Sequence, residues 1–310
     1  MSIQWYPGHM HKAIKEMKEN LPKMDVVIEV LDARIPFSSE NPQINQIRGD
    51  KPCIKIMTKC DLADPDLTQA WQAYFEQDRH VKTLALTIEQ PDKMRQVLDL
   101  CRKIVPSKAN NDKPVHAMIM GIPNVGKSTL INTLAGRTIA KTGNEPAVTK
   151  GQQQINLRNG ILLYDTPGVL WPKVESEFSG YRLATTGAIK ETAMSNDDVA
   201  FFAANYLLPS YPDALRTRYQ LEELPNTEIE FFETIGAKRG CMVSGGRVDL
   251  ERICKIFLTE YRGGTLGRIT LETPEMIEKE IVIVAEQIAE QQAKKEARKL
   301  ARQAKKRKRR

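Results

Sequence analysis

The chain has 310 residues, 41% of them hydrophobic, which is enough to bury a full α/β core and still form a second domain. Its net charge of +7 is uneven, because residues 291–310 hold eleven Lys or Arg against one acidic residue, Glu296, which leaves the other 290 residues at −3. Five scattered cysteines without CxxC spacing argue against a disulfide framework and a zinc site, and no apolar run approaches the roughly 20 residues that span a bilayer. We expect a cytoplasmic protein with no membrane partner.

The first part of the chain alternates between short apolar runs and helical patterns. The segment Asp25–Arg34 contains an apolar run that ends in polar residues, as a buried parallel strand does. We predict further strands over residues 53–57 and 82–86, and helices over residues 12–21, 65–77 and 91–105.

The alternation resumes after a polar segment, residues 107–113, which we interpret as a splice between an ancestral C-terminus and an ancestral N-terminus. Strands are then predicted over residues 116–120, 153–157 and 161–164. Together these elements predict a doubly wound, mostly parallel sheet that binds ligands at the carboxyl ends of its strands.

The strand pattern fades beyond about Trp171, and apolar residues recur at helical spacing through residues 179–261. Pro274 opens a long helix that becomes too basic to pack after Gln291. We therefore predict three parts. They are an α/β domain over residues 1–175, a smaller all-α domain over residues 176–290, and a disordered basic tail over residues 291–310.

The strongest motif is GIPNVGKST, residues 121–129, which matches the phosphate-loop pattern GxxxxGK[ST]. It follows a predicted strand and opens a helix, which is the context expected for a phosphate loop. Its glycines allow backbone N–H groups to converge on phosphate oxygens. Lys127 is expected to bridge the β and γ phosphates in catalysis, and Ser128 to bind Mg²⁺. The predicted nucleotide-binding residues of this loop are Asn124, Val125, Gly126, Lys127, Ser128 and Thr129.

A second phosphate-side motif is DTPG, residues 165–168, at the end of a predicted strand. Asp165 is expected to hold Mg²⁺ through water, and the Gly168 N–H to contact the γ-phosphate. Thr149 is the best candidate for a catalytic switch threonine that closes over Mg²⁺ and the γ-phosphate. Thr138 and Thr142 are weaker candidates for that role.

The motif TKCD, residues 58–61, indicates selection of guanine. The Asp61 carboxylate can accept two hydrogen bonds from the guanine edge, which adenine lacks, and the Lys59 stem can cover the ring. Thr58 stands where such motifs usually have Asn, but its hydroxyl can still tie this loop to the phosphate loop. A third base-contacting loop is expected near Thr87, although the usual Ser-Ala-Lys signature is missing there.

The order of these motifs is unusual, because TKCD precedes the phosphate loop instead of following it. In an ordinary guanine-nucleotide switch the phosphate loop comes first. The sequence therefore predicts a circularly permuted P-loop GTPase domain with GTP as substrate and Mg²⁺ as cofactor.

The group that promotes hydrolysis is not evident beside DTPG. Val169 and Leu170 stand where many switches have a glutamine that orients water, and neither can do so. The side-chain oxygen of Asn124 is a candidate ligand for a monovalent cation beside the phosphates. A role of Asn124 in stabilising the loop carries equal weight.

The permuted order, together with five short motifs, resembles the bacterial ribosome biogenesis GTPase A family, also called the YlqF family. The motifs are WYPGHM at 5–10, LDAR at 31–34, GIPNVGKST at 121–129, DTPGVLWP at 165–172 and GGTLGRITLE at 263–272. The resemblance implies a GTPase that binds the maturing large ribosomal subunit and its rRNA, promotes a late assembly step and is stimulated by that particle.

The resemblance also implies particular roles for two residues. His9 corresponds to the histidine considered to replace the missing glutamine, and Asn124 to an asparagine that uses K⁺. His9 could equally start a helix or contact RNA. The helical domain and basic tail are expected to contact RNA phosphates with little sequence preference and no DNA partner, and a merely solubilising tail is the alternative.

Two other functions remain possible on the sequence. One is an RNA-binding scaffold whose guanine-nucleotide site turns over slowly and is mainly structural. The other is an ATP-dependent phosphotransferase, which TKCD disfavours.

Overall fold

A computed structural model describes residues 8–109, 113–140, 153–157, 160–171, 174, 176–189 and 194–307. Its contacts divide the chain into two compact units, Met1–Glu272 and Thr273–Arg310. This division does not test the domain boundary expected at residue 175, which stays a prediction.

The first unit is built on one sheet, whose order over the described residues is β3-β2-β1-β4-β6-β5. Neighbouring strands are parallel except β5, which runs antiparallel to β6. Every residue of β1 and β2 is buried, as is usual for the central strands of a doubly wound sheet. The strands are β1 Val26–Asp32, β2 Cys53–Thr58, β3 Val81–Ala85, β4 Val115–Gly121, β5 Gln153–Asn156 and β6 Ile161–Asp165.

The register of the sheet brings the predicted motifs to one edge. Asp32 at the end of β1 pairs with Thr58 at the end of β2, so both carboxyl ends lie together. On the other side of β1, Val30 pairs with Gly121 at the end of β4. The loops after β1, β2, β4 and β6 therefore lie on the same edge, where ligands bind in this fold class.

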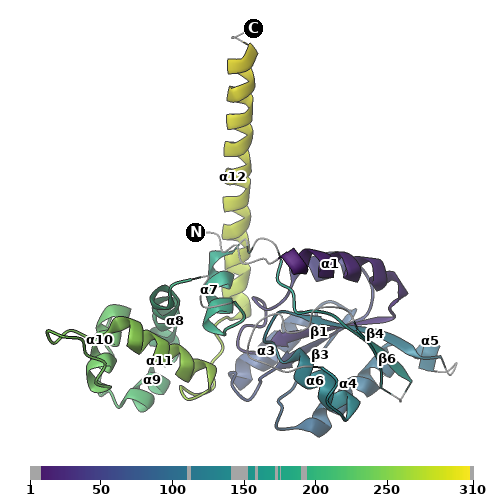
Figure 1. The fold of residues 1–310 in the computed structure, drawn as a ribbon, viewed down its shortest axis with the longest axis horizontal. Helices are drawn as coiled ribbons and strands as arrows, with labels where there is room; N and C mark the ends of the chain where they lie inside the picture. The colour runs from purple at the N-terminus through teal and green to yellow at the C-terminus, as the bar shows by residue number, and fades with distance from the viewer. Residues whose placement is uncertain are drawn as a thin grey trace. The chain divides into compact units, whose positions relative to one another are not determined.

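Helices cover both faces of the sheet. Figure 1 shows α4 and α6 together on one face and α1 on the other. Helix α3 begins where the Asp64 carboxylate accepts the N–H of Asp66 (2.9 Å) and that of Leu67 (3.2 Å), with Pro65 in the first turn. The elements are α1 Gly8–Asn20, the 3₁₀ helix η1 Leu21–Lys23, α2 Pro42–Arg48, α3 Pro65–Phe75, α4 Pro91–Ile104, α5 Pro106–Ala109 and α6 Lys127–Ala135.

Two short helices differ from the expectation. Helix α2 was not predicted, although Asn41 caps it by accepting the Gln43 N–H and Pro42 opens it. Helix α5 occupies the start of the segment interpreted as a polar splice. Both helices are too short for hydrophobic periodicity to reveal them.

The remaining helices of the first unit are α7 Glu177–Thr185, α8 Asn196–Ser210, α9 Pro212–Tyr219, α10 Glu228–Lys238 and α11 Leu250–Arg262. Among them, Phe231, Phe232 and Phe257 are buried and pack edge to face. After α11 the chain returns to the sheet through residues 263–272, which we call the return segment. Its Ile269 N–H donates to the Leu62 carbonyl (2.9 Å), in the loop after β2.

The second unit contains α12, Pro274–Arg307, whose side chains are mostly exposed over residues 281–299. The start of this helix at Pro274 was predicted. The disordered tail expected from residue 291 is instead helical through Arg307, because Ala, Gln, Lys, Arg and Glu all favour helix. No helix in the described part of the chain is long and apolar enough to cross a membrane.

Candidate functional site

The phosphate loop joins β4 to α6 and has the backbone that its motif demands. Asn124 and Gly126 have φ of +59° and +90°, in the left-handed region that turns the chain into the helix. Gly121 lies against β1, where an added Cβ would be 2.7 Å from the Val30 carbonyl oxygen. The loop therefore ends at Lys127 with the first N–H groups of α6 directed into it.

Lys127 and Asp165 form a buried ion pair at the centre of this edge. The ammonium donates to the Asp165 carboxylate, which lies at the end of β6. Burial raises the pKa of the Asp165 carboxyl, and the charge of Lys127 opposes that rise. The two groups predicted to handle phosphate and Mg²⁺ are thus in direct contact.

The DTPG loop packs on the phosphate loop. An added Cβ at Gly168 would lie 3.1 Å from the Pro123 Cα, so only glycine permits this approach without movement of the backbone. The Val169 N–H donates to the Gly121 carbonyl (3.2 Å), and the Thr166 hydroxyl donates to that of Ile119 (2.9 Å). The two phosphate-side motifs therefore form one structure.

The TKCD loop is joined to the phosphate loop by two side chains. The Thr58 hydroxyl lies 2.5 Å from the Val125 carbonyl oxygen and 2.9 Å from that of Leu31, which confirms that it ties the two loops together. Lys59 has a φ of +58°, and its ammonium donates to the Asn124 carbonyl (2.8 Å). Segments that are far apart in the sequence, and in reversed order, thus meet at one site.

The ammonium of Lys59 is also held by the first strand. It donates to Asp32 Oδ2 at 2.7 Å, while Arg34 donates to both oxygens of that carboxylate, at 2.9 and 2.8 Å. Burial alone would raise the pKa of the Asp32 carboxyl, but the charges of Arg34 and Lys59 hold that pKa well below its usual value. Sequence reasoning missed this role of Asp32, although its place at the end of a buried strand beside TKCD was a usable signal.

The loop that contains Thr87 lies next to TKCD, and its contact with the base stays a prediction. The Cys60 N–H donates to the Leu86 carbonyl (3.4 Å), and the Leu86 N–H to that of Met57 (2.8 Å). Thr87 is buried and its hydroxyl accepts the Glu89 N–H. Asp61 is partly exposed between these loops.

Asn124 has a structural partner. Its side-chain amide donates to the carbonyl of Gly187, in the turn after α7, at 2.9 Å. This contact favours the loop-stabilising interpretation, and K⁺ binding by the side-chain oxygen stays a prediction.

The metal ligands expected on the phosphate side fit Mg²⁺ in chemical type. Ser128 lies in the first turn of α6, and Asp165 lies at the end of β6. The Ser128 hydroxyl and the Asp165 carboxylate are hard oxygen donors, which Mg²⁺ prefers. Thr129 follows in the same turn of α6. Within the described residues no cluster of three or more His, Cys, Asp or Glu could hold a metal ion.

Three predicted positions cannot be placed fully. His9 lies in the first turn of α1, but its side chain is outside the described part of the chain. Thr149 and its rival Thr142 also lie outside the described residues, whereas Thr138 is exposed shortly after α6.

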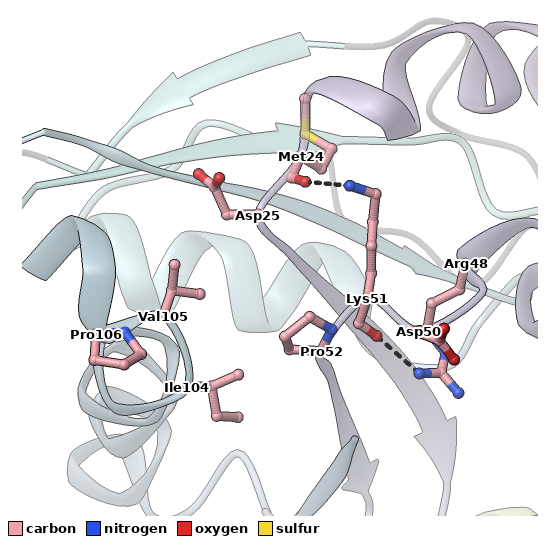
Figure 2. A pocket seen from close by; sticks show the side chains of 9 residues that line it. All are labelled: Met24, Asp25, Arg48, Asp50, Lys51, Pro52, Ile104, Val105 and Pro106. Carbon is pink, nitrogen blue, oxygen red and sulfur yellow. Dashed lines mark hydrogen bonds between the residues drawn. The ribbon is translucent and has the colours of Figure 1, made fainter. Parts of the chain in front are cut away.

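An open pocket lies at the opposite edge of the sheet, where β1 and β2 begin (Figure 2). Its cationic groups already have partners, since the Lys51 ammonium donates to the Met24 carbonyl (2.8 Å) and Arg48 donates to that of Lys51 (2.8 Å). Asp25 at its rim pairs with Lys108. Because it lies at the opposite edge of the sheet, this pocket is separate from the site formed by the predicted motifs.

The fold and the site define a circularly permuted GTPase. Residues 116–234 match a family model described as 50S ribosome-binding GTPase. A Bacillus cereus protein named ribosome biogenesis GTPase A is 44% identical over 288 residues, covering 91% of this chain and 97% of that protein. The protein of that name from Thermotoga maritima is 32% identical over 275 residues, covering 89% and 96%.

Solved structures agree with these relatives. The GNP-bound structure of YlqF from T. maritima matches with a TM-score of 0.60 and 29% identity, covering 86% of this chain and 99% of that one. A GDP-bound YlqF structure matches with the same TM-score. The chain belongs to the ribosome biogenesis GTPase A family, so the resemblance noted in the sequence is confirmed, and the protein is a GTP-hydrolysing enzyme of ribosome biogenesis.

Proposed function

We propose that this GTPase binds the maturing large ribosomal subunit through rRNA, promotes a late step of its assembly and hydrolyses GTP faster on that particle. The observation that carries the nucleotide part is the contact of TKCD with the phosphate loop, through Thr58 to Val125 and Lys59 to Asn124. The description of the matching family as 50S ribosome-binding, and the names of the relatives, support the ribosomal part.

In this proposal the two ends of the site divide the work. Asp61 selects guanine and Lys59 covers its ring, while Lys127 neutralises charge on the β and γ phosphates. Mg²⁺, held through Ser128 and Asp165, would supply further positive charge to the phosphates. The ion pair of Lys127 with Asp165 supports this assignment, since it holds both side chains where the phosphate loop converges.

The proposal includes a dependence of hydrolysis on the particle. Val169 and Leu170 are buried, so the residues after Gly168 place no polar group toward a water. His9 is proposed to supply the missing group when the ribosomal particle orders it, and Thr149 to close over Mg²⁺ and the γ-phosphate. K⁺ beside Asn124 would add charge where other GTPases use an arginine.

The basic end of the chain supports contact with RNA. Eight of the eleven Lys or Arg of residues 291–310 lie within α12, and those up to Lys299 have exposed side chains, which is a surface for phosphate backbone. Binding through it should weaken steeply with salt and show little sequence preference. The expected location, the cytoplasm, remains a prediction.

Sedimentation with ribosomal subunits tests the central part of the proposal. With a non-hydrolysable GTP analogue the protein should travel with large subunits, and with GDP it should stay largely unbound. Equal sedimentation in the two nucleotides, or with small subunits only, would contradict the proposal.

Turnover separates the proposal from the alternative of an RNA-binding scaffold. The buried apolar pair after Gly168 favours slow intrinsic hydrolysis in both cases. Large subunits should raise the turnover rate of the wild-type protein and leave that of His9→Ala low, with GTP affinity unchanged, and His11→Ala is the matched control. A wild-type rate indifferent to the particle would favour the scaffold, and normal stimulation of His9→Ala would remove His9 from catalysis.

A further inference from the structure

The loop that carries Asp61 is held from outside by the return segment. The Ile269 N–H donates to the Leu62 carbonyl (2.9 Å), and Arg268 donates to the carbonyls of Cys60 and Ala63, both at 3.1 Å. The residues on either side of Asp61 therefore both bond to a part of the chain some two hundred residues away in sequence.

Close packing reinforces these hydrogen bonds. Gly264 has a φ of +76°, and a Cβ added there would lie 2.6 Å from the Leu62 Cδ2 atom. The side chain next to Asp61 thus lies directly against the backbone of the return segment. Such contact restricts the loop in a way that the TKCD motif alone does not.

Thr270 joins this loop to the loop after β1. Its hydroxyl, which is fully buried, accepts the Asp64 N–H at 3.1 Å and donates to the Ala33 carbonyl at 3.3 Å. The Leu271 N–H donates to the Arg34 carbonyl (2.8 Å), in the same turn that holds Asp32. The return segment therefore fixes the Asp61 loop against the loop that holds the Lys59 ammonium.

The helical region contributes to the same contact. The Tyr211 hydroxyl, between α8 and α9, accepts the Thr270 N–H at 3.2 Å and lies 3.2 Å from Asp64 Oδ2 and 3.1 Å from the Thr270 carbonyl oxygen. The Tyr211 hydroxyl is a donor at neutral pH, as any tyrosine is, and burial raises its pKa further above the ordinary value. Buried networks of this kind fix geometry when every member has a partner.

We propose that Thr270, together with Arg268 and Tyr211, is a positioning element for guanine selection, which sets the Asp61 carboxylate against the base. This rests on the proposed role of TKCD in reading guanine. A carboxylate placed for two hydrogen bonds discriminates strongly against a base that offers only one, and a small displacement weakens that discrimination. Because the element includes Tyr211, guanine selection depends on how the helical region is attached.

Competition of unlabelled GDP and IDP against a fluorescent GDP analogue, in Mg²⁺, tests the proposal. Inosine lacks the 2-amino group that guanine offers to Asp61. The Kd of IDP divided by the Kd of GDP therefore measures how well Asp61 engages guanine, and this quotient is the ratio used below. Thr270→Val keeps the shape and removes both hydrogen bonds, and should lower the ratio about threefold to tenfold. Thr270→Ser keeps the hydroxyl and should retain the wild-type ratio.

Arg268→Ala provides a second test at an exposed position, where a folding defect is not expected, and the exposed Arg252→Ala is its control. It should also lower the ratio, whereas general loosening would weaken GDP and IDP equally and leave the ratio unchanged. An unchanged ratio in both Thr270→Val and Arg268→Ala, with a guanine-selective wild type, would overturn the proposal. A wild-type protein that fails to prefer GDP to IDP and ADP would instead overturn the assigned role of TKCD, and this proposal with it.

Discussion

The phosphate end and the base end of the nucleotide site are built in different ways. At the phosphate end, Lys127, Asp165 and Gly168 belong to two short motifs that contact each other directly. At the base end, TKCD depends on Asp32 from another strand and on the return segment. A nearly self-contained structure thus faces one that is assembled from distant parts of the chain.

The difference shows which contacts circular permutation leaves unchanged and which it adds. The strand order keeps TKCD beside the phosphate loop, because β1 lies between β2 and β4 whichever strand comes first. The chain after DTPG now leads into helices, and it returns across the base end before α12. In the function proposed above, the base end is therefore the place where nucleotide selection and the helical region are physically joined.

The largest expected effect is at the phosphate end. Lys127→Ala should lower the single-turnover hydrolysis rate about 100-fold or more, because it removes a preorganised charge from the phosphates. The measurement is phosphate release from limiting GTP with the enzyme in saturating excess, and the exposed Lys82→Ala is the control. A loss of less than about threefold would show that the phosphate end does not depend on this motif.

A change of preference is expected at the base end. Asp61→Asn replaces an acceptor by a donor at the base edge. It should therefore lower the Kd of XTP relative to the Kd of GTP by about tenfold or more. Titration of both nucleotides measures it, and the exposed Asp66→Asn is the control. Retained preference for GTP would remove TKCD from base selection.

The smallest effect concerns the link between the two ends. Thr58→Val removes the hydroxyl that bonds to Val125 and Leu31, and should weaken GDP binding by roughly twofold to tenfold, the value of about one hydrogen bond. Thr58→Ser should bind like the wild type. Equal affinity of Thr58→Val and wild type would show that the link contributes nothing to the site.

The sequence predicted the strands of the sheet and the local backbone of the phosphate motifs well. The strands at residues 53–57 and 161–164 end within one residue of β2 and β6, because apolar runs bounded by polar residues mark buried parallel strands. Both phosphate motifs have backbone demands that glycine meets locally, so their spacing in sequence indicated their geometry.

The support of the base end could not be read in the same way. Thr270 and Tyr211 lie far from TKCD in sequence, and a threonine or tyrosine gives no local signal of a hydrogen bond across the fold. The helix α12 continues to Arg307, and the sequence did not reveal this for another reason. The high charge after residue 291 indicated disorder, whereas the helix propensity of the same residues favours helix.

A crystal structure with a non-hydrolysable GTP analogue and Mg²⁺ tests the central claim most directly, because that claim is the union of two reversed segments around one nucleotide. The account predicts the phosphates within the loop from Gly121 to Ser128, near Lys127, and the guanine edge within hydrogen-bond distance of the Asp61 carboxylate. Phosphates bound at Lys127 with the base directed away from Asp61 would contradict it.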